Sequence, residues 1–265
     1  MNKSIVLISG ASSGIVLKTA HYLHQLGYQV IGVSRSYPTS DYEFDYYLCD
    51  ITKENDILQL KMTILQKYGH LDVLVNAAGM GISGPIEYTS QALIDKIYAV
   101  NVFGHVQMTN HLLECLKKSS RAKIINISSI ASDIAIPFQA FYSMTKASID
   151  AYTKALSIEL KPYGIQVTSI LPGDIKTGFT AHREKPSFDQ SDPYFKRYQS
   201  SLARMEKDEQ NGLDPIVIAR KVHRLIRKKH VPLRTTVGLS YKLIRFMYRI
   251  LPEKFVFWVV GKLYG

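Results

Sequence analysis

The feature that most constrains this chain is a regular alternation of short apolar runs with longer segments of helical periodicity. Runs of strand length occupy residues 5–8, 30–33, 46–49, 73–75, 124–127 and 167–171. Helical periodicity predicts helices over residues 14–26, 53–68, 90–118, 139–161, 191–208 and 215–228. Strands that alternate with helices form parallel sheets whose two faces are covered by helices. We therefore expect an α/β fold built on a doubly wound parallel sheet.

The composition indicates one domain. The chain has 265 residues, of which 46% are hydrophobic, and no internal repeat or low-complexity linker divides it, so we expect a single domain over residues 1–265. Cys49 and Cys115 show no metal-ligand spacing. We interpret them as buried small hydrophobes in a reducing, cytoplasmic compartment and expect no metal site. The first apolar run is too short for a signal peptide.

The net charge of +11 is concentrated late in the chain. A basic cluster could meet nucleic acid, an anionic membrane surface or a phosphorylated ligand, or it could be the solvated face of the helix that begins after Asp214. None of the nucleic-acid-binding motifs accompanies it, so we expect no nucleic-acid partner. The cluster consists of Arg220, Lys221, Arg224, Arg227, Lys228, Lys229 and Arg234.

A glycine-rich turn joins the first strand to the first helix. Residues 9–16 read Ser-Gly-Ala-Ser-Ser-Gly-Ile-Val. Unpaired amide groups and the helix dipole make such a turn a site for phosphate, which is typical of Rossmann-type dinucleotide binding, although a turn can also be purely structural. The candidate phosphate-binding residues are Gly10, Ser12, Ser13, Gly14 and Ile15.

Tyr142 and Lys146 are four residues apart in the predicted helix 139–161 and therefore project from one face. A free tyrosine has a pKa of about 10, so its use as a base near neutrality requires roughly 4 kcal/mol of stabilisation of the ionised form. A cation within about 4 to 6 Å can supply much of that. The two-residue pattern alone is more typical of an ordinary amphipathic helix, so the other motifs must decide.

Together these motifs resemble the short-chain dehydrogenase/reductase family. The glycine turn is similar to its T-G-x-x-x-G-x-G motif, with Ser9 in place of the threonine and Val16 in place of the third glycine. A valine there should push the helix outward or weaken the grip on the cofactor. Ser129 precedes Tyr142 by 13 residues (142 − 129), as the catalytic serine of the family does.

The resemblance implies hydride transfer between a nicotinamide and a carbonyl or alcohol carbon. Ser129 would polarise the substrate oxygen, Tyr142 would exchange its proton, and Lys146 would hold the nicotinamide ribose and stabilise the tyrosinate. Asn101, in the segment Val-Asn-Val-Phe-Gly, would hold a water molecule that completes the proton path.

The remaining cofactor positions follow from the same resemblance. Arg35 occupies the place where NAD-preferring members carry an acid, which favours NADP(H), although it could also be a solvated loop charge. Asp50 could instead cap its own turn, and Asn76 could instead link strands. An open loop is expected over residues 36–43, beside the adenosine. Beyond the glycine turn, Tyr142 and Lys146, the implied cofactor residues are Ser34, Arg35, Asp50, Ile51, Asn76, Ala77, Gly79, Pro172, Gly173, Ile175 and Thr177.

Two later segments concern the substrate. Residues 178–212 are polar with interspersed aromatics, which suits a mobile substrate lid or a rigid surface loop. The C-terminal extension, residues 238–265, carries a basic amphipathic helix over 241–251 that Pro252 ends. It resembles the extensions of hydroxysteroid- and retinol-acting family members. It would form a wall of a hydrophobic pocket or an interfacial foot on a membrane, or pack on its own domain or a second subunit.

We therefore expect an NADP(H)-dependent oxidoreductase acting on a secondary alcohol or ketone of a hydrophobic, steroid-like or lipid-like molecule. A 3-oxoacyl or sugar carbonyl reductase of the same family is the alternative. A third hypothesis, from another class, is an NADPH-binding sensor or scaffold with little turnover, motivated by Val16 and the basic tail. The resemblance also implies a homodimer or homotetramer, cytoplasmic or peripheral at a membrane surface.

Overall fold

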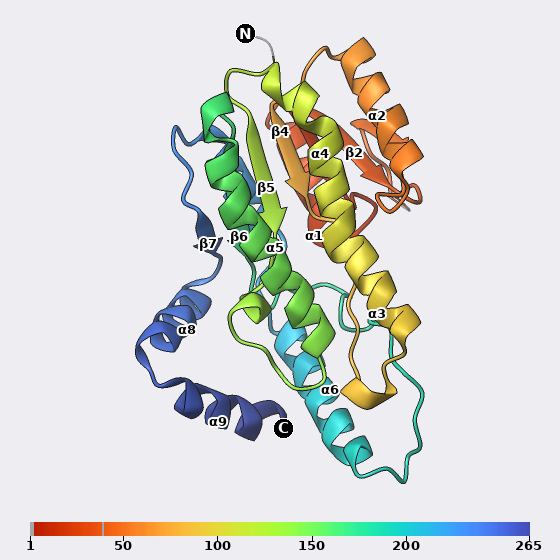
Figure 1. Ribbon diagram of the computed structural model, residues 1–265, viewed down its shortest axis with the longest axis vertical. Coiled ribbons are helices and arrows are strands. Elements are labelled where there is room, and N and C mark those ends of the chain that lie inside the picture. Colours follow the sequence, from red (N-terminus) through yellow and green to blue (C-terminus); the bar gives the residue numbers. More distant parts are fainter. Residues whose placement is uncertain (1–2, 39) are drawn as a thin grey trace.

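The computed structural model describes residues 3–38 and 40–265, and within these ranges seven strands form one parallel sheet (Figure 1). The strand order is β3-β2-β1-β4-β5-β6-β7, so the chain reverses direction across the sheet between β1 and β4. The predicted doubly wound α/β fold is confirmed. The strands are β1 (Ile5–Ser9), β2 (Gln29–Ser34), β3 (Asp45–Leu48), β4 (Val73–Asn76), β5 (Lys123–Ile127), β6 (Gln166–Leu171) and β7 (Arg234–Thr236).

Strand β7 was not predicted. Its sequence, Arg-Thr-Thr, has no apolar run, and it is defined by its pairing with β6, in which Ser169 is the partner of Arg234. The pairing is between residues far apart in the chain, so no local pattern reveals it. The loop predicted over 36–43 lies between β2 and β3, and residue 39 within it falls outside the described residues, as do residues 1 and 2.

The helices lie near their predicted bounds, with one interruption. The predicted helix over 90–118 is α3 (Gln91–Tyr98), a π-helical segment (Ala99–Phe103) and α4 (Gly104–Lys117). π-helical segments often mark functional positions, and this one contains Asn101. The other helices are α1 (Gly14–Gln25), α2 (Glu54–Lys67), α5 (Ala140–Glu159), α6 (Tyr194–Gln210), α7 (Ile216–Arg227), α8 (Leu239–Ile250) and α9 (Glu253–Tyr264).

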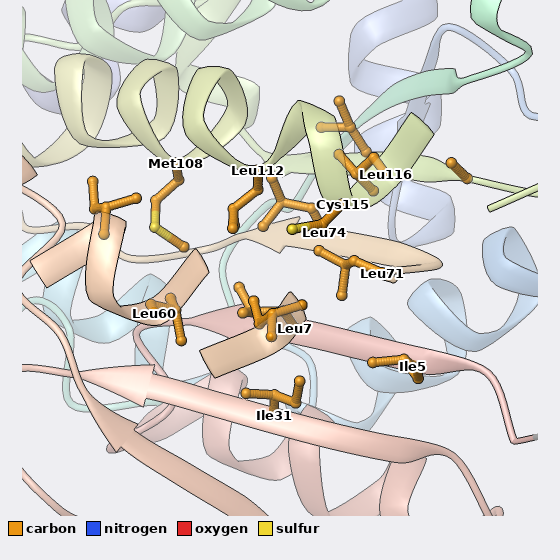
Figure 2. Packing of buried hydrophobic residues seen from close by; sticks show 14 of the residues in the cluster. Ile5, Leu7, Ile31, Leu60, Leu71, Leu74, Met108, Leu112, Cys115 and Leu116 are labelled. Carbon is orange, nitrogen blue, oxygen red and sulfur yellow. The ribbon is translucent and has the colours of Figure 1, made fainter. Parts of the chain in front are cut away.

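The core has two layers, one on each face of the sheet. Alternate side chains of β1 point to opposite faces, so that Leu7 belongs to the layer under α2, α4 and α5, whereas Ile8 belongs to the layer under α1 and α7. Figure 2 shows the first layer, where Leu7 and Leu74 of the sheet meet Met108 and Leu112 of α4. This packing fixes the carboxyl ends of the strands at one edge of the sheet.

Both cysteines are free and buried in the first layer, as predicted. Burial raises the pKa of the Cys49 thiol to about 12, because the thiolate would lose its hydration. Cys115 packs among leucines of α4 (Figure 2). The two thiols therefore serve as small apolar core residues.

The basic cluster divides into two parts. Arg220, Arg224 and Arg227 are exposed on α7, which fits the solvated-face interpretation. Arg234 is instead largely buried and contacts Asp133 and Asp150, each at 2.6 Å. Arg234 thus has a structural role inside the domain, unlike the three exposed arginines of α7.

The C-terminal extension forms two helices, α8 and α9, separated at Pro252, and both lie beyond the carboxyl ends of the strands (Figure 1). Arg245 of α8 donates a hydrogen bond to Asp133 (2.8 Å), and Tyr241 donates one to Asp174 (2.7 Å). Helix α9 packs against α6. No helix within the described ranges is both long enough and apolar enough to cross a bilayer.

Candidate active site

A cavity of about 1040 Å³ runs from the glycine turn, along the carboxyl ends of the strands, to helices α8 and α9. Ligands of open parallel sheets bind at this edge, next to the point where the strand order reverses. The cavity brings together all but two of the predicted site residues. Those on its wall are Gly10, Ser12, Ser13, Gly14, Ile15, Ser34, Arg35, Asp50, Ile51, Ala77, Gly79, Ser129, Tyr142, Lys146, Pro172, Gly173, Ile175 and Thr177.

The glycine turn is built for close approach of two backbones. Gly10 has a φ of +82°, and a Cβ placed there would lie 2.7 Å from the Cα of Ala78. The Ser9 hydroxyl accepts a hydrogen bond from the Ala77 N–H (3.0 Å), which ties this turn to the one after β4. Helix α1 begins immediately afterwards, at Gly14, on the cavity wall. The turn and helix N-terminus therefore fit a pyrophosphate group.

Val16 is half-buried, lines the cavity and packs against the second core layer. The valine thus fills space between α1 and the sheet, where a glycine would leave the helix free to move closer. A weakened grip on the cofactor at this position stays a prediction.

At the adenosine end of the cavity, Arg35 is exposed after β2 and forms no ion pair with any described residue. Asp50 accepts hydrogen bonds from the N–H (3.0 Å) and hydroxyl (2.8 Å) of Thr52, and so caps its own turn while lining the cavity. The Arg35 guanidinium group therefore carries a charge that no ion pair among the described residues compensates, which suits an anionic ligand group.

Two predicted residues lie behind the wall. Asn76 is fully buried and donates hydrogen bonds to Asn126 Oδ1 (3.0 Å) and Thr109 Oγ1 (3.1 Å), which link β4 to β5 and α4. Its predicted place on the cofactor surface is corrected accordingly, because the amide faces the interior of the sheet. Asn76 supports the turn at 77–79 without forming part of the wall.

Asn101 is also fully buried, in the π-helical segment. Its Oδ1 accepts from the Met80 N–H (2.8 Å), and its Nδ2 donates to the Met80 carbonyl (2.9 Å) and to Thr145 Oγ1 (3.2 Å). The side chain holds the backbone after Gly79 against α5, beneath the cavity floor. Its role in a proton path stays a prediction.

Tyr142 and Lys146 share one face of α5, as predicted. The Lys146 Nζ lies 5.6 Å from the centre of the Tyr142 ring and donates a hydrogen bond to the Ile127 carbonyl (3.0 Å). Ser129 follows β5, lines the same cavity, and its Oγ accepts from the Ala131 N–H (3.1 Å). The phenol, the ammonium group and the serine hydroxyl therefore converge on one stretch of the wall.

Burial dominates the ionisation of this group. It raises the pKa of Tyr142, while the Arg183 guanidinium and the Ser129 hydroxyl, which lie beside the phenol, lower it. Burial also lowers the pKa of Lys146 to about 8. Arg183 is thus a second cation beside the phenol that the sequence did not indicate, and stabilisation of the tyrosinate by Lys146 stays a prediction.

His105 supports the floor beneath Lys146. Its Nε2 lies 2.7 Å from the carbonyl oxygen of Ala78, and the ring is fully buried. Burial, followed by the nearby Lys146 charge, lowers the pKa of His105 to about 3, so the imidazole is neutral and donates to that carbonyl. A mid-helix histidine carried no signal of this role in the sequence.

Arg183 was not predicted as a site residue. It lies in the loop after β6, lines the cavity, and its guanidinium carbon lies 5.4 Å from the centre of the Phe179 ring. That ring in turn lies 5.7 Å from the ring of Tyr142. A single arginine in a polar, aperiodic loop gives no local signal, which is why sequence reasoning missed it.

The predicted lid segment, residues 178–212, is anchored at its start by Glu209 of α6. This carboxylate accepts hydrogen bonds from Thr177 Oγ1 (2.6 Å), the Phe179 N–H (2.8 Å) and the Thr180 N–H (2.7 Å). Tyr198 of α6 is buried beneath the loop. The segment borders the cavity through residues 178–180, 182–183 and 209, and its motion as a lid stays a prediction.

Helices α8 and α9 form the far wall of the cavity. Unlike the turn end, this wall is mostly aliphatic and aromatic, which suits an apolar ligand. Its residues include Ile244, Met247, Tyr248, Leu251, Val256, Val259 and Val260.

Known proteins resemble this chain over much of its length. The family model for short chain dehydrogenase matches residues 4–187. A 3-ketodihydrosphingosine reductase of Bacteroides thetaiotaomicron is 36% identical over 239 residues, covering 90% of this chain and 89% of the relative. An NADPH-dependent 1-acyldihydroxyacetone phosphate reductase of Saccharomyces cerevisiae is 30% identical over 69% of this chain and 65% of its own length. The crystal structure of a short-chain dehydrogenase from Streptomyces avermitilis superposes with a TM-score of 0.79 at 24% identity, covering 94% of this chain and 93% of that one.

Proposed function

The chain belongs to the short-chain dehydrogenase/reductase family, and we propose on that premise that it is an NADP(H)-dependent reductase of a ketone in a lipid-like molecule. The observation that carries the proposal is the single cavity with a polar phosphate-binding turn at one end and an apolar wall at the other. Tyr142 lies between the two ends. The geometry suits a substrate whose carbonyl lies at Tyr142 and whose apolar chain extends toward α8 and α9.

The residues present fit a nicotinamide cofactor, because Gly14, where an added Cβ would meet nothing within 4 Å, and the start of α1 leave the backbone open to a pyrophosphate. When bound, the nicotinamide supplies the hydride. Ser129 hydrogen-bonds to the substrate carbonyl oxygen, and Tyr142 gives that oxygen its proton as the alcohol forms. Lys146, held by the Ile127 carbonyl, keeps a positive charge beside the phenol.

The preference for NADP(H) follows from Arg35, since a guanidinium binds a 2′-phosphate well and no described acid neutralises it. The NADPH dependence printed in the name of the yeast relative is consistent with this proposal.

The lipid-like substrate is supported by the apolar far wall and by the names of two relatives, a 3-ketodihydrosphingosine reductase and a 1-acyldihydroxyacetone phosphate reductase. A sugar would leave its hydroxyl groups unpaired against the aliphatic side chains of α9, which is costly. A steroid-like ring system would also fit an apolar wall, so a ketosteroid has to be tested beside the long-chain ketones.

The decisive experiment measures NADPH consumption with long-chain 3-keto lipids, a ketosteroid, an acetoacetyl thioester and a ketose. We expect the highest kcat/KM with the long-chain ketones. Tyr142→Phe should keep NADPH binding and lose about 10²- to 10⁴-fold in kcat, because it removes the proton donor. Full activity in that variant would contradict the assignment. Tight NADPH binding without turnover of any ketone would favour the sensor or scaffold instead.

We also propose a cytoplasmic homo-oligomer. Two free buried thiols suit a reducing compartment. Helix α5 and the π-helical segment expose apolar side chains suited to a second copy, with Phe103 at 57%, Met144 at 49% and Ile158 at 74% exposure. Light scattering of the protein in solution measures the oligomeric state directly.

A further inference from the structure

Helix α8 is attached to the domain by its polar residues and exposes its apolar ones. Tyr241 and Arg245 face inward, where they donate to Asp174 and Asp133. Leu239, Phe246 and Ile250 face outward, with 83%, 58% and 59% of their surface exposed. A helix of a soluble domain normally has the opposite arrangement. The outer face of α8 therefore lacks the apolar partner that its composition requires.

Helix α9 continues the exposed apolar surface. Trp258 is 60% exposed and stacks on Phe255, with ring centres 6.0 Å apart, and Phe257 is also exposed. Only one side of α9 is committed to the domain, through Val260 and through Tyr264, which donates to Asp208 (2.7 Å). The two helices lie next to each other at one end of the molecule (Figure 1). Their exposed side chains therefore form an extended apolar surface there.

The charges on this surface indicate which partner it suits. Lys242, Arg249, Lys254 and Lys262 are exposed on α8 and α9, whereas Glu253 is the only acid in residues 238–265. Two copies meeting through this surface would bring like charges together. An anionic lipid surface, by contrast, accepts both the apolar side chains and the lysine and arginine heads.

The rim of the cavity lies on the same surface. Leu243, Ile244, Met247, Phe255 and Leu263 line the cavity and are at the same time exposed to solvent, from 37% for Met247 to 60% for Leu243. They form an apolar edge between the cavity and the exposed faces of α8 and α9.

We propose that the outer faces of α8 and α9 dock on an anionic membrane surface and that the cavity opens there toward the lipid. The docking itself stands on the exposed side chains. The consequence for catalysis rests on the proposed function: a ketone lipid would pass from the bilayer to Tyr142 along an apolar path, without its chain crossing water.

Trp258 is the only tryptophan of the chain and reports directly on docking. The full-length protein is mixed with vesicles of phosphatidylcholine, with or without phosphatidylglycerol. We expect a blue shift of the tryptophan emission and flotation of the protein with the anionic vesicles, both reduced by added salt. Absence of a shift and of flotation would overturn the proposal.

The variant Phe246→Ser/Ile250→Ser removes two outward side chains that do not line the cavity. We expect vesicle affinity to fall about tenfold or more, since each large apolar side chain contributes strongly to insertion. Leu58→Ser/Met62→Ser changes two exposed apolar side chains four residues apart on α2, at 36% and 54% exposure, and is the matched control that should bind vesicles like the parent. Equal vesicle binding by the parent and the double variant would contradict the proposal.

Charge is tested separately with Arg249→Gln/Lys254→Gln, which should weaken binding to anionic vesicles about fivefold per charge. Light scattering without vesicles completes the design. A dimer that Phe246→Ser/Ile250→Ser dissociates, in a protein that does not bind vesicles, would assign this surface to a second copy and overturn the membrane proposal. Turnover of a water-soluble ketone, measured in the same samples, tests the proposed function independently of docking.

Discussion

Tyr142 and Lys146 lie where burial disfavours the charged form of each side chain. The sequence spacing correctly predicted that they share a face of α5, because helical geometry alone fixes that relation. It could not predict that a second cation, Arg183, lies beside the phenol. That depends on how the loop after β6 folds back over the site, and Arg183 reaches Tyr142 only through that loop.

The charge of Arg183 should influence the pH dependence of alcohol oxidation. It lowers the pKa of Tyr142, so Arg183→Gln should let that pKa rise further, whereas Arg183→Lys keeps a positive charge. Alcohol oxidation requires the ionised phenol, so its rate increases as pH rises through the pKa. The pH profile of kcat/KM for oxidation should therefore move to higher pH in Arg183→Gln and much less in Arg183→Lys. Superimposable profiles for the parent and Arg183→Gln would show that Arg183 acts only in packing.

The charge of Arg35 should determine the relative affinity for NADPH and NADH. Arg35→Asp places an acid where the 2′-phosphate is proposed to bind, so we expect NADPH affinity to fall roughly 10- to 100-fold through lost attraction and added repulsion. NADH has no such phosphate and serves as the internal control. Dissociation constants for both nucleotides, measured by fluorescence titration, give the ratio. An unchanged ratio would mean that Arg35 is a solvated loop charge.

At the scale of elements, the order of strands and helices followed from periodicity, but their interruptions did not. The π-helical segment Ala99–Phe103 interrupts a continuous helical pattern, and it contains Asn101, whose amide pairs with the backbone of Met80. Pairing of this kind joins residues about twenty positions apart and leaves no trace in local propensity. Strand β7 was missed for the same reason.

The packing of helix α1 on the sheet depends on Val16. Val16 packs between α1 and the second core layer, so Val16→Gly should destabilise the protein by about 2 kcal/mol, from lost apolar burial and lower helix propensity. If the valine holds α1 away from the phosphate site, the same variant should bind NADPH more tightly. Denaturant unfolding and NADPH titration measure the two effects, with Val16→Ala as the intermediate control. Lower stability without tighter binding would show that Val16 is a packing residue only.

At the scale of the molecule, the glycine turn, Ser129, Tyr142 and Lys146 lie on the sheet and its helices, whereas the C-terminal extension, residues 238–265, completes the cavity. The sequence predicted an amphipathic tail but left open whether it forms a pocket wall, packs on the domain or meets a partner. The structure shows that two of these descriptions hold together, since α8 and α9 are anchored to Asp174, Asp133 and Asp208 and also line the cavity. Their inner and outer surfaces could be distinguished only once the anchors were known.

The apolar far wall of the cavity should determine how long a substrate chain the protein accepts. Val256 is half-buried on α9 and lines the far wall, well separated in the chain from the catalytic residues. Val256→Phe should shorten the apolar end of the cavity and lower kcat/KM for a long-chain ketone about tenfold, because the chain end loses space worth roughly 1 to 3 kcal/mol. A short-chain ketone does not reach this wall and should be turned over as before.

Phe257→Ala changes a neighbouring side chain on the exposed side of α9 and is the matched control, since Phe257 does not line the cavity. Measured with detergent-dispersed substrates and without vesicles, so that membrane docking does not contribute, its ratio of long-chain to short-chain kcat/KM should equal that of the parent protein. A ratio that falls in Phe257→Ala and not in Val256→Phe would place the substrate chain outside the cavity. Selectivity for chain length would then have to arise from the outer surface of α9, because the inner wall would have been altered without effect.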